Sequence, residues 1–398
     1  MTQQSPTDNA HPTNTPVRIL HITNRLGVGG PAMYVTLLAQ GFKARGYDVE
    51  VICGETDAAH GDMTYFADRY GIQPRIFPQL GGVVTPLNDI IALWRLYHFM
   101  REYQPDVVHT HTTKAGFVGR LAAYLARVPV IVHTFHSHVF EGYFGSALTR
   151  FFILMERLAA RMSDVVLTLT ESLRSELADE YHITRRGRIM VLPLGLDLAS
   201  FADTPRKLGT FRATWNIPAD APLVGIIGRL VPIKNHKLFL QSARRIIETN
   251  PQVRFVIIGD GEERPMLESL VHDYHLENAV TFTGWQSNLL EIYSDLDVSV
   301  VSSINEGTPV SVIESLSATC PVVATRVGGV PDLLNGGAYG VLVPPNDPSA
   351  MARALLKVLN NPPDVTEAQT IMLESYGMER LVNDMDSLYR GLLAKKRR

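Results

Sequence analysis

The chain has 398 residues, which at about 150 residues per domain predicts two or three domains. Hydrophobic residues make up 45% and charged residues 19%, a balance that excludes a mainly disordered protein. The formal net charge of −3 gives no reason to expect nucleic acid as a partner. Two cysteines, Cys53 and Cys320, are too few for a disulfide framework and indicate a reducing compartment.

Residues 1–16 are polar and lack the apolar stretch of a secretory signal, so we expect them to form a loose tail. The chain also carries no uncharged apolar run of about 18 residues, and a membrane-spanning helix is not expected. Together these features predict a cytoplasmic protein that at most rests on a membrane surface.

Short apolar runs alternate with helical patterns along the chain. The first group of expected strands lies at 18–23, 48–52, 106–109, 129–134 and 164–169. After a break rich in Pro, Gly and Asp at 191–205, a second group follows at 223–227, 254–258, 279–282, 298–301 and 321–324. Buried strands separated by helices predict an α/β fold, with two units in series and a parallel sheet in each. Because such sheets bind ligands at the carboxyl ends of their strands, we expect the site in the cleft between the units.

A glycine-rich loop follows the first strand. Gly27, Gly29 and Ala32 fit a loose G-x-G-x-x-A pattern, and Glu50 lies about 20 residues further on, as in dinucleotide-binding sites. Residues 24–26 separate the strand from the first glycine, however, which a tight dinucleotide turn does not allow. The loop is therefore either a ligand-facing segment, whose amides approach a phosphate or sugar, or a plain strand-to-helix turn.

Two cations follow the first strand of the second unit. Arg229 and Lys234 lie five positions apart in GRLVPIK and can converge on a diphosphate, the arginine through its planar fork and the lysine as a point charge. If this motif stood alone, a solvated basic turn that leads into a helix would be the favoured interpretation.

The most specific pattern is NEGTPVSVIE, which follows the strand at 298–301. We expect Thr308 to cap a helix that has Pro309 in its first turn, with free amides facing the cleft. Glu306 then lies in the loop and Glu314 inside the helix, about 10 Å apart at 1.5 Å of rise per residue. Such a pair can hold the two ends of one ligand by its hydroxyls. The alternative is that Glu306 only interacts with the helix dipole and Glu314 is a surface residue.

Histidines gather at expected strand ends of the first unit, namely His109, His111, His133, His136 and His138. We interpret them as polar contacts in the cleft; buried core histidines and a zinc site are the alternatives. Asp295 and Asp297 form an Asp-x-Asp motif at a helix-to-strand junction, which we interpret as structural.

The segment 142–162 mixes aromatic residues with Arg150, Arg157 and Arg161, and the chain ends in a basic run at 395–398. This pattern fits either a basic amphipathic surface against anionic lipid or a core helix with its arginines extended to water.

Taken together, the motifs resemble glycosyltransferase family 4, whose members are retaining enzymes of the GT-B architecture. The resemblance runs from about residue 18 to 389. It rests on the G-R-L-x-x-x-K and E-x7-E motifs, supported by the GxGG loop, VIIGDG at 256–261, FTGW at 282–285 and VGGVPD at 327–332.

The resemblance implies two Rossmann-like domains with parallel sheets facing across a cleft. Residues 17–200 would bind the acceptor and 201–377 the nucleotide sugar. Residues 378–398 would form a helix that crosses back to the first domain, for which Leu381, Met385, Leu388 and Leu392 have helical spacing.

The resemblance also implies residue roles. Arg229 and Lys234 match the contacts to the donor diphosphate, Glu314 the acid on the ribose hydroxyls, and Glu306 the acid near the donor sugar. Trp285 would lie beside the nucleobase and His136 near the anomeric carbon. The remaining donor-side candidates are Gly29, Gly30, Gly307, Thr308, Pro309 and Val310; those on the acceptor side are His109, His111, Lys114 and His138. Ser137 and His138 depart from the commonest family form, in which a small residue or glycine follows that strand.

The implied reaction transfers a sugar from a nucleotide diphosphate to an acceptor hydroxyl with retention of the anomeric configuration. UDP-sugars are the first candidate donors and GDP-mannose the second. No metal or other cofactor is expected, because the nucleotide sugar is a co-substrate and the cations can carry the charge of the diphosphate. The first-domain motifs are similar to those of bacterial enzymes of cell-envelope polysaccharide synthesis, which favours a glycan or lipid-linked acceptor at the inner face of the membrane. The alternatives are a nicotinamide-dependent oxidoreductase and a catalytically silent sugar-binding subunit.

Overall fold

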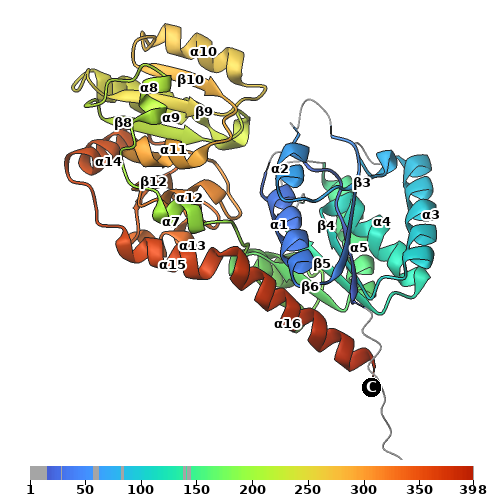
Figure 1. The fold of residues 1–398 in the computed structure, drawn as a ribbon. Coiled ribbons are helices and arrows are strands. Elements are labelled where there is room, and N and C mark those ends of the chain that lie inside the picture. The colour runs from blue at the N-terminus through green and yellow to red at the C-terminus, as the bar shows by residue number, and fades with distance from the viewer. Residues whose placement is uncertain are drawn as a thin grey trace, which may run out of the picture.

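The computed structural model describes residues 16–27, 29–56, 62–81, 85–137, 140 and 145–397. These residues form two lobes, each built on a sheet whose strands all pair in parallel (Figure 1). The strand order is β3-β2-β1-β4-β5-β6-β7 in the first sheet and β10-β9-β8-β11-β12-β13 in the second. The expected fold of two α/β units with parallel sheets is confirmed.

The first sheet contains the five strands expected from the sequence, with ends shifted by one or two residues. Its strands are β1 (Arg18–Ile22), β2 (Asp48–Cys53), β3 (Arg75–Ile76), β4 (Val107–His111), β5 (Val130–Phe135), β6 (Val165–Thr168) and β7 (Ile189–Val191). Strands β3 and β7 were not expected from the sequence. Both are edge strands of two or three residues, too short to show a buried pattern.

The second sheet also contains all five of its expected strands. Its strands are β8 (Leu223–Ile227), β9 (Arg254–Ile258), β10 (Val280–Gly284), β11 (Val298–Val301), β12 (Val322–Thr325) and β13 (Val341–Val343). The unexpected strand is again the short one at the edge, β13.

Helices cover both sheets. Those of the first lobe are α1 (Gly30–Ala44), α2 (Thr64–Arg69), α3 (Pro86–Tyr103), α4 (Thr113–Ala126), α5 (Ser146–Met162) and α6 (Glu171–Ser175). Those that follow are α7 (Ala199–Asp203), α8 (Thr210–Thr214), α9 (His236–Ile247), α10 (Arg264–Asp273), α11 (Leu289–Asp295), α12 (Val310–Ser317), α13 (Val330–Leu333), α14 (Pro348–Asn360), α15 (Thr366–Tyr376) and α16 (Met378–Lys396). Short 3-10 or π turns lie at Pro78–Leu80, Glu176–Glu180, Arg186–Arg188, Pro232–Lys234 and Asn335–Gly337. Among the described residues, no helix combines the length and apolar character needed to span a bilayer.

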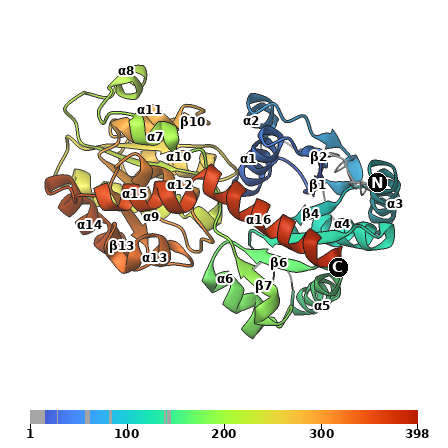
Figure 2. The same ribbon diagram turned by 60° about the horizontal axis from the view of Figure 1, so that its bottom comes forward.

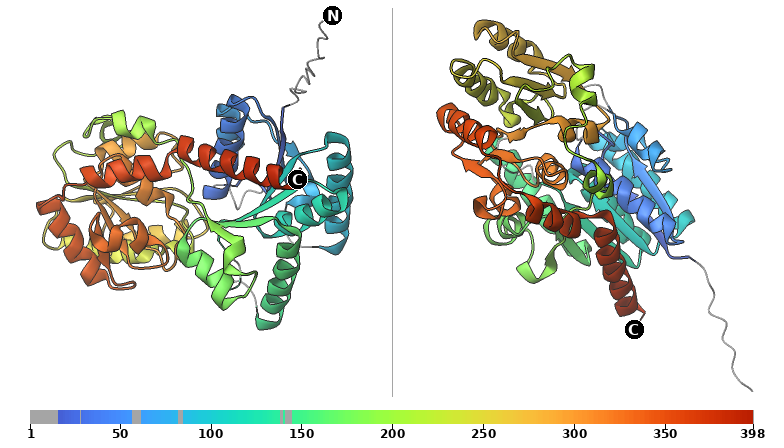
Figure 3. Two further views of the ribbon diagram at one scale, coloured as in Figure 1. Left: turned by 90° about the horizontal axis from the view of Figure 1, so that it is seen from below. Right: turned by 60° about the vertical axis from the view of Figure 1, so that its left-hand side comes forward.

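The last helix, α16, leaves the second lobe and lies along the first, as Figures 2 and 3 show from two sides. It packs against α1, where the ring of Tyr389 stacks on that of Phe42 at a centroid distance of 5.3 Å. The Tyr389 hydroxyl also lies 2.6 Å from Nδ1 of the buried His109. The last helix therefore contributes to the interior of the first lobe.

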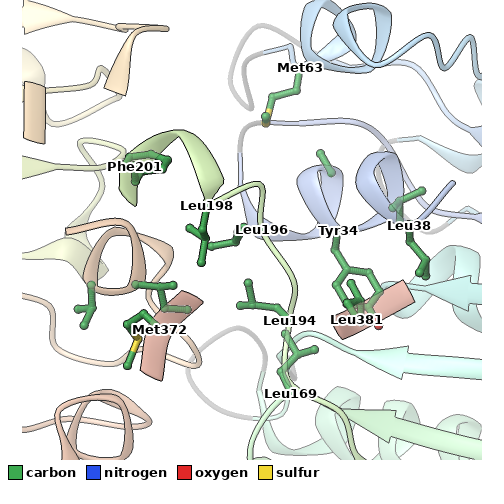
Figure 4. Packing of buried hydrophobic residues seen from close by; sticks show 14 of the residues in the cluster. Tyr34, Leu38, Met63, Leu169, Leu194, Leu196, Leu198, Phe201, Met372 and Leu381 are labelled. Carbon is green, nitrogen blue, oxygen red and sulfur yellow. The ribbon is translucent and has the colours of Figure 1, made fainter. Parts of the chain in front are cut away.

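One buried apolar cluster continues from lobe to lobe (Figure 4). Leu194, Leu196 and Leu198 lie on the connecting segment, between Tyr34 of α1 and Phe201 of α7. Burial of about 25 cal/mol per Å² of apolar surface is the main stabilising term in such a cluster. The connection between the lobes is thus part of the core.

We predict that Gly41→Ala destabilises the protein by about 1–3 kcal/mol through overpacking of α1 against α16. A Cβ at Gly41 would lie 2.4 Å from Cγ2 of Val382. Urea unfolding measures the loss, and Val382→Ala in the same chain should restore most of it, because the clashing methyl is then absent. Gly391→Ala, in the facing helix α16, is the control, since a Cβ there meets nothing within 4 Å. Equal stability of Gly41→Ala and the parent protein would contradict the packing described.

Candidate active site

The second-lobe half of the site is built at the ends of two neighbouring strands. Strands β8 and β11 pair directly, so the loops that follow them, 228–235 and 302–309, meet at one edge of the sheet. Gly328 packs closely against the second loop. Its φ of 48° favours glycine, and a Cβ there would lie only 1.8 Å from the carbonyl oxygen of Glu306. The VGGVPD motif therefore supports the position of the loop that carries Glu306.

Lys234 and Glu306 are brought into direct contact by this arrangement. Nζ of Lys234 lies 2.5 Å from Oε1 of Glu306, and the Ser303 hydroxyl donates a hydrogen bond of 2.6 Å to the same oxygen. The Glu306 side chain is only 10% exposed, whereas that of Lys234 is 29% exposed. The lysine thus keeps an open side toward the cleft, and the alternative in which Glu306 only interacts with a helix dipole does not describe its environment.

Arg229 lies in the same loop system as Lys234. It is partly exposed, and its guanidinium has no hydrogen bond or ion pair within the described part of the chain. Its donors are therefore available to an anion at the same place. Trp285, directly after β10, is 48% exposed. Its expected place beside a nucleobase remains a prediction.

Glu314 is buried inside α12, which excludes the surface alternative. Its side chain accepts a hydrogen bond of 3.0 Å from the hydroxyl of Tyr293. Burial raises the pKa of Glu314 to about 7, while the Tyr293 hydrogen bond favours the charged form and opposes the rise.

The expected cap of α12 is wrong by one residue. Pro309, with extended ψ, is the N-cap, and the helix begins at Val310. Thr308 does not cap it: its hydroxyl oxygen is buried with no hydrogen-bond partner among the described residues. The φ of Pro309, −69°, is compatible with a helix, but its ψ of 109° is extended, so the helix begins one residue later than expected.

The two lobes approach each other at this point. A Cβ at Gly30, in the first turn of α1, would lie 3.8 Å from Cγ2 of Val310. A Cβ at Gly307 would lie 3.5 Å from the carbonyl oxygen of His136. The glycine loop and His136 of the first lobe therefore face the loop and helix start that follow Glu306.

Histidines line the first-lobe side at the ends of β4 and β5, but not all of them face the cleft. His136 is partly exposed, and its Nε2 lies 3.2 Å from Nδ1 of His111. His111 is fully buried behind it. Burial lowers the pKa of His136 to about 3 and that of His111 well below its ordinary value, so both rings are neutral at pH 7.

The assignment of His109 to the acceptor side is corrected. Its Nδ1 is bonded to the Tyr389 hydroxyl and its Nε2 to the Thr134 hydroxyl at 2.7 Å, and the residue has no exposed surface. Neither nitrogen remains for an acceptor, because α16 returns to cover the ring. Lys114 is also buried, and its ammonium lies 2.9 Å from Asp89. His138 lies outside the described residues.

His21 of β1 was not among the expected site residues, and its Nδ1 lies 3.2 Å from Nε2 of His111. The available signal was a histidine between apolar neighbours inside the strand RILHI. His21, His109 and His111 bring ligand atoms within 4.8 Å of one another. The zinc alternative did not include His21, so this group is a different set of histidines. Both ring nitrogens of His109 also already make hydrogen bonds, to Tyr389 and Thr134.

The structural interpretation of the Asp-x-Asp motif is confirmed. The carboxylate of Asp295 accepts hydrogen bonds from the amides of Gly209 and Arg212, and Asp297 pairs with the Arg212 guanidinium at 2.9 Å. Both acids thus fasten α8 to the sheet.

Each of the two lobes matches a protein-family model. Residues 28–200 match the model described as Glycosyltransferase Family 4, and residues 209–372 match that described as Glycosyl transferases group 1. The two matches together extend over most of the chain.

The matches to curated relatives extend over most of this chain and most of each relative. The chain is 29% identical over 321 residues to UDP-Gal:alpha-D-GlcNAc-diphosphoundecaprenol alpha-1,3-galactosyltransferase of Escherichia coli, covering 79% of this chain and 81% of the relative. It is 29% identical over 370 residues to D-inositol 3-phosphate glycosyltransferase of Kineococcus radiotolerans, covering 84% and 83%.

Solved structures share the fold. Sucrose-phosphate synthase from Thermosynechococcus elongatus matches with a TM-score of 0.77 at 23% identity, covering 95% of this chain and all of that one. Anabaena HepE in complex with UDP matches with a TM-score of 0.79 at 19% identity, covering 94% and 100%.

We predict that Glu314→Gln stabilises the protein, and more at pH 8 than at pH 5. The native pKa of about 7 lies above the ordinary 4.5, so the parent protein loses stability as the pH rises from 4.5 to 7 and the buried acid ionises. A shift of this size corresponds to a loss on the order of 3 kcal/mol. Glutamine does not ionise and avoids the loss.

Urea unfolding at both pH values measures this difference. Glu374→Gln, at an exposed position of α15, is the control and should change stability equally at pH 5 and pH 8. A gain for Glu314→Gln that is also equal at the two pH values would show that the acid is not held in its neutral form.

Proposed function

This chain belongs to glycosyltransferase family 4 and has the GT-B fold; from this premise we propose that it moves a sugar from a UDP-sugar to an acceptor hydroxyl with retention of the anomeric configuration. GDP-mannose is the second candidate donor. The observation that carries the proposal is the contact of Lys234 with Glu306 beside Arg229, facing His136 across the cleft. Family membership argues against the oxidoreductase alternative.

Negative charge on the departing diphosphate is the main barrier to be lowered. Breaking the bond between the anomeric carbon and the phosphate oxygen leaves its electron pair on the UDP. Arg229 and Lys234 offer two positive charges there, and the N-terminus of α12 adds the positive end of its helix dipole. This set of groups can bear the charge without a metal ion, and we propose a metal-independent reaction.

The proposed attack occurs on the face from which the diphosphate departs. The acceptor oxygen bonds to the anomeric carbon, and its proton passes to a phosphate oxygen of the leaving UDP. In this proposal Glu306 binds hydroxyls of the donor sugar and Glu314 those of the ribose. No described carboxylate is assigned the part of a covalent nucleophile, so a trapped glycosyl-enzyme adduct would contradict this path.

The proposed acceptor is a glycan or a lipid-linked saccharide of cell-envelope polysaccharide synthesis. The Escherichia coli relative is named for a diphosphoundecaprenol acceptor, which supports this class. The acceptor would enter beside His136, from the first-lobe side of the cleft.

A lipid-linked acceptor requires the enzyme to reach a bilayer, and we propose that the outer surface of α5 lies on the inner face of the cytoplasmic membrane. Leu148, Phe151 and Leu154 form an exposed stripe on this helix, at 45%, 50% and 51% exposure. Arg150 and Arg161 are exposed on the same helix and suit anionic headgroups. Residues 142–144, which begin the aromatic and basic segment 142–162 of the sequence analysis, lie outside the described residues.

We predict that Lys234→Ala lowers turnover about 10²- to 10³-fold, because it removes a charge that stabilises the leaving diphosphate. Release of UDP from a panel of UDP-sugars, with GDP-mannose included, measures the rate. Lys237→Ala, exposed on the next turn, is the matched control and should keep the parent rate. Near-parent turnover in Lys234→Ala would refute the site, and absence of release from every donor would favour the catalytically silent alternative.

Replacing Leu148 and Phe151 together by Gln is expected to weaken binding to anionic vesicles at least tenfold, because two apolar side chains no longer enter the bilayer. Co-sedimentation with vesicles rich in phosphatidylglycerol measures the bound fraction. The control replaces Leu208 and Met266 of the second lobe, which are 42% and 40% exposed, and should leave binding unchanged. Equal loss in both variants would exclude α5 as the contact surface.

A further inference from the structure

Three histidines form a continuous hydrogen-bonded chain from the interior of the first sheet to the cleft. Nδ1 of His21 lies 3.2 Å from Nε2 of His111, and Nδ1 of His111 lies 3.2 Å from Nε2 of His136. The residues come from β1, from β4 and from the turn after β5, which are neighbours in the sheet. No sequence motif joins them.

The three rings are neutral, so each carries one N–H. Burial lowers the pKa of His21 and of His136 to about 3, and that of His111 well below its ordinary value. One N–H per ring permits only two arrangements of the chain, because His111 uses both of its nitrogens. Either every ring donates toward the cleft, or every ring donates toward the interior.

The inner end of the chain distinguishes the two arrangements. Nε2 of His21 is buried and has no hydrogen-bond partner among the described residues. If the rings donated inward, this atom would carry an N–H with no acceptor, and orphaned buried N–H groups are rare and costly. If the rings donate outward, the atom carries only a lone pair, and every N–H of the chain is either bonded or at the cleft.

The outer end is suited to the same direction. Nδ1 of His136 makes no hydrogen bond within the described residues, and the residue is partly exposed. The His136 main chain faces Gly307, which follows Glu306. A donor group at this point would meet the oxygens of a sugar or diphosphate, which are acceptors.

We propose that His21 and His111 are positioning residues that fix His136 in the tautomer protonated at Nδ1, so that its N–H donates a hydrogen bond into the cleft. His21 donates to His111, His111 donates to Nε2 of His136, and the proton of His136 is left on the side of the bound donor. The importance of this donor for transfer rests on the proposed function; the direction of the chain does not.

The direct test is the tautomer of His136 in the full chain. Two-bond ¹H–¹⁵N correlation spectra of protein labelled with ¹⁵N-histidine separate protonated from bare ring nitrogens, and His136→Gln identifies the signal. At pH 7 and without substrate, we expect a protonated Nδ1 and a bare Nε2. A protonated Nε2, or a mixture of the two tautomers, would overturn the proposal.

Two substitutions of His21 test the origin of this preference. His21→Leu removes the first donor and should give mixed His136 tautomers, with turnover lowered about tenfold. His21→Asn places an amide N–H near the position of Nδ1 and should restore the single tautomer and most of the turnover. His133→Gln is the control, because His133 bonds to Thr110 and not to the chain; the His136 tautomer should not change. An unchanged tautomer in His21→Leu would exclude His21 as the source.

The outcomes separate the two proposals. The wild-type spectrum decides the direction of the chain even if His21→Leu fails to fold. An outward chain in a protein that releases no UDP from any donor would leave this inference standing and remove the proposed function. An inward chain in a protein that releases UDP would overturn this inference and leave the proposed function standing.

Discussion

The ion pair between Lys234 and Glu306 is the interaction on which the candidate site depends. A cation and an acid 72 residues apart in sequence meet at 2.5 Å because β8 and β11 are adjacent parallel strands whose carboxyl ends open at one edge. In a largely buried position such a pair is costly to break, since the acid would be left without a counter-charge. The pair thus holds both loops in place while the open side of the lysine, with Arg229 beside it, faces the cleft.

Burial controls the protonation of the remaining site groups. Glu314 is held close to neutrality inside α12, and the histidines of the first lobe are held neutral beneath the cleft. Charge in the free site is therefore concentrated on the two cations and Glu306. Such a distribution suits a ligand whose negative charge is confined to its diphosphate and whose other groups are hydroxyls.

The lobes are tied together by the connecting segment and by the last helix. The segment with Leu194, Leu196 and Leu198 belongs to the shared apolar cluster, and α16 returns to the first lobe, where Tyr389 bonds to His109. The same return explains why His109 is unavailable to an acceptor although it lies two residues from His111. His109 belongs to β4, but its contact with α16 buries it, so its side chain is not available in the cleft.

Local sequence was sufficient for ten strands, for the break between the units and for the loops that carry Arg229, Lys234 and Glu306, because buried strands and their terminal loops leave a pattern within a few residues. It was insufficient for the short edge strands β3, β7 and β13, which are too brief to show one. Only the tertiary structure decided that Pro309 rather than Thr308 precedes α12, that Glu314 is buried against Tyr293, and that His21 joins His111 and His136. The last two facts depend on groups distant along the chain, whose proximity is set by the order and packing of strands and helices, and no periodicity within a single segment records them.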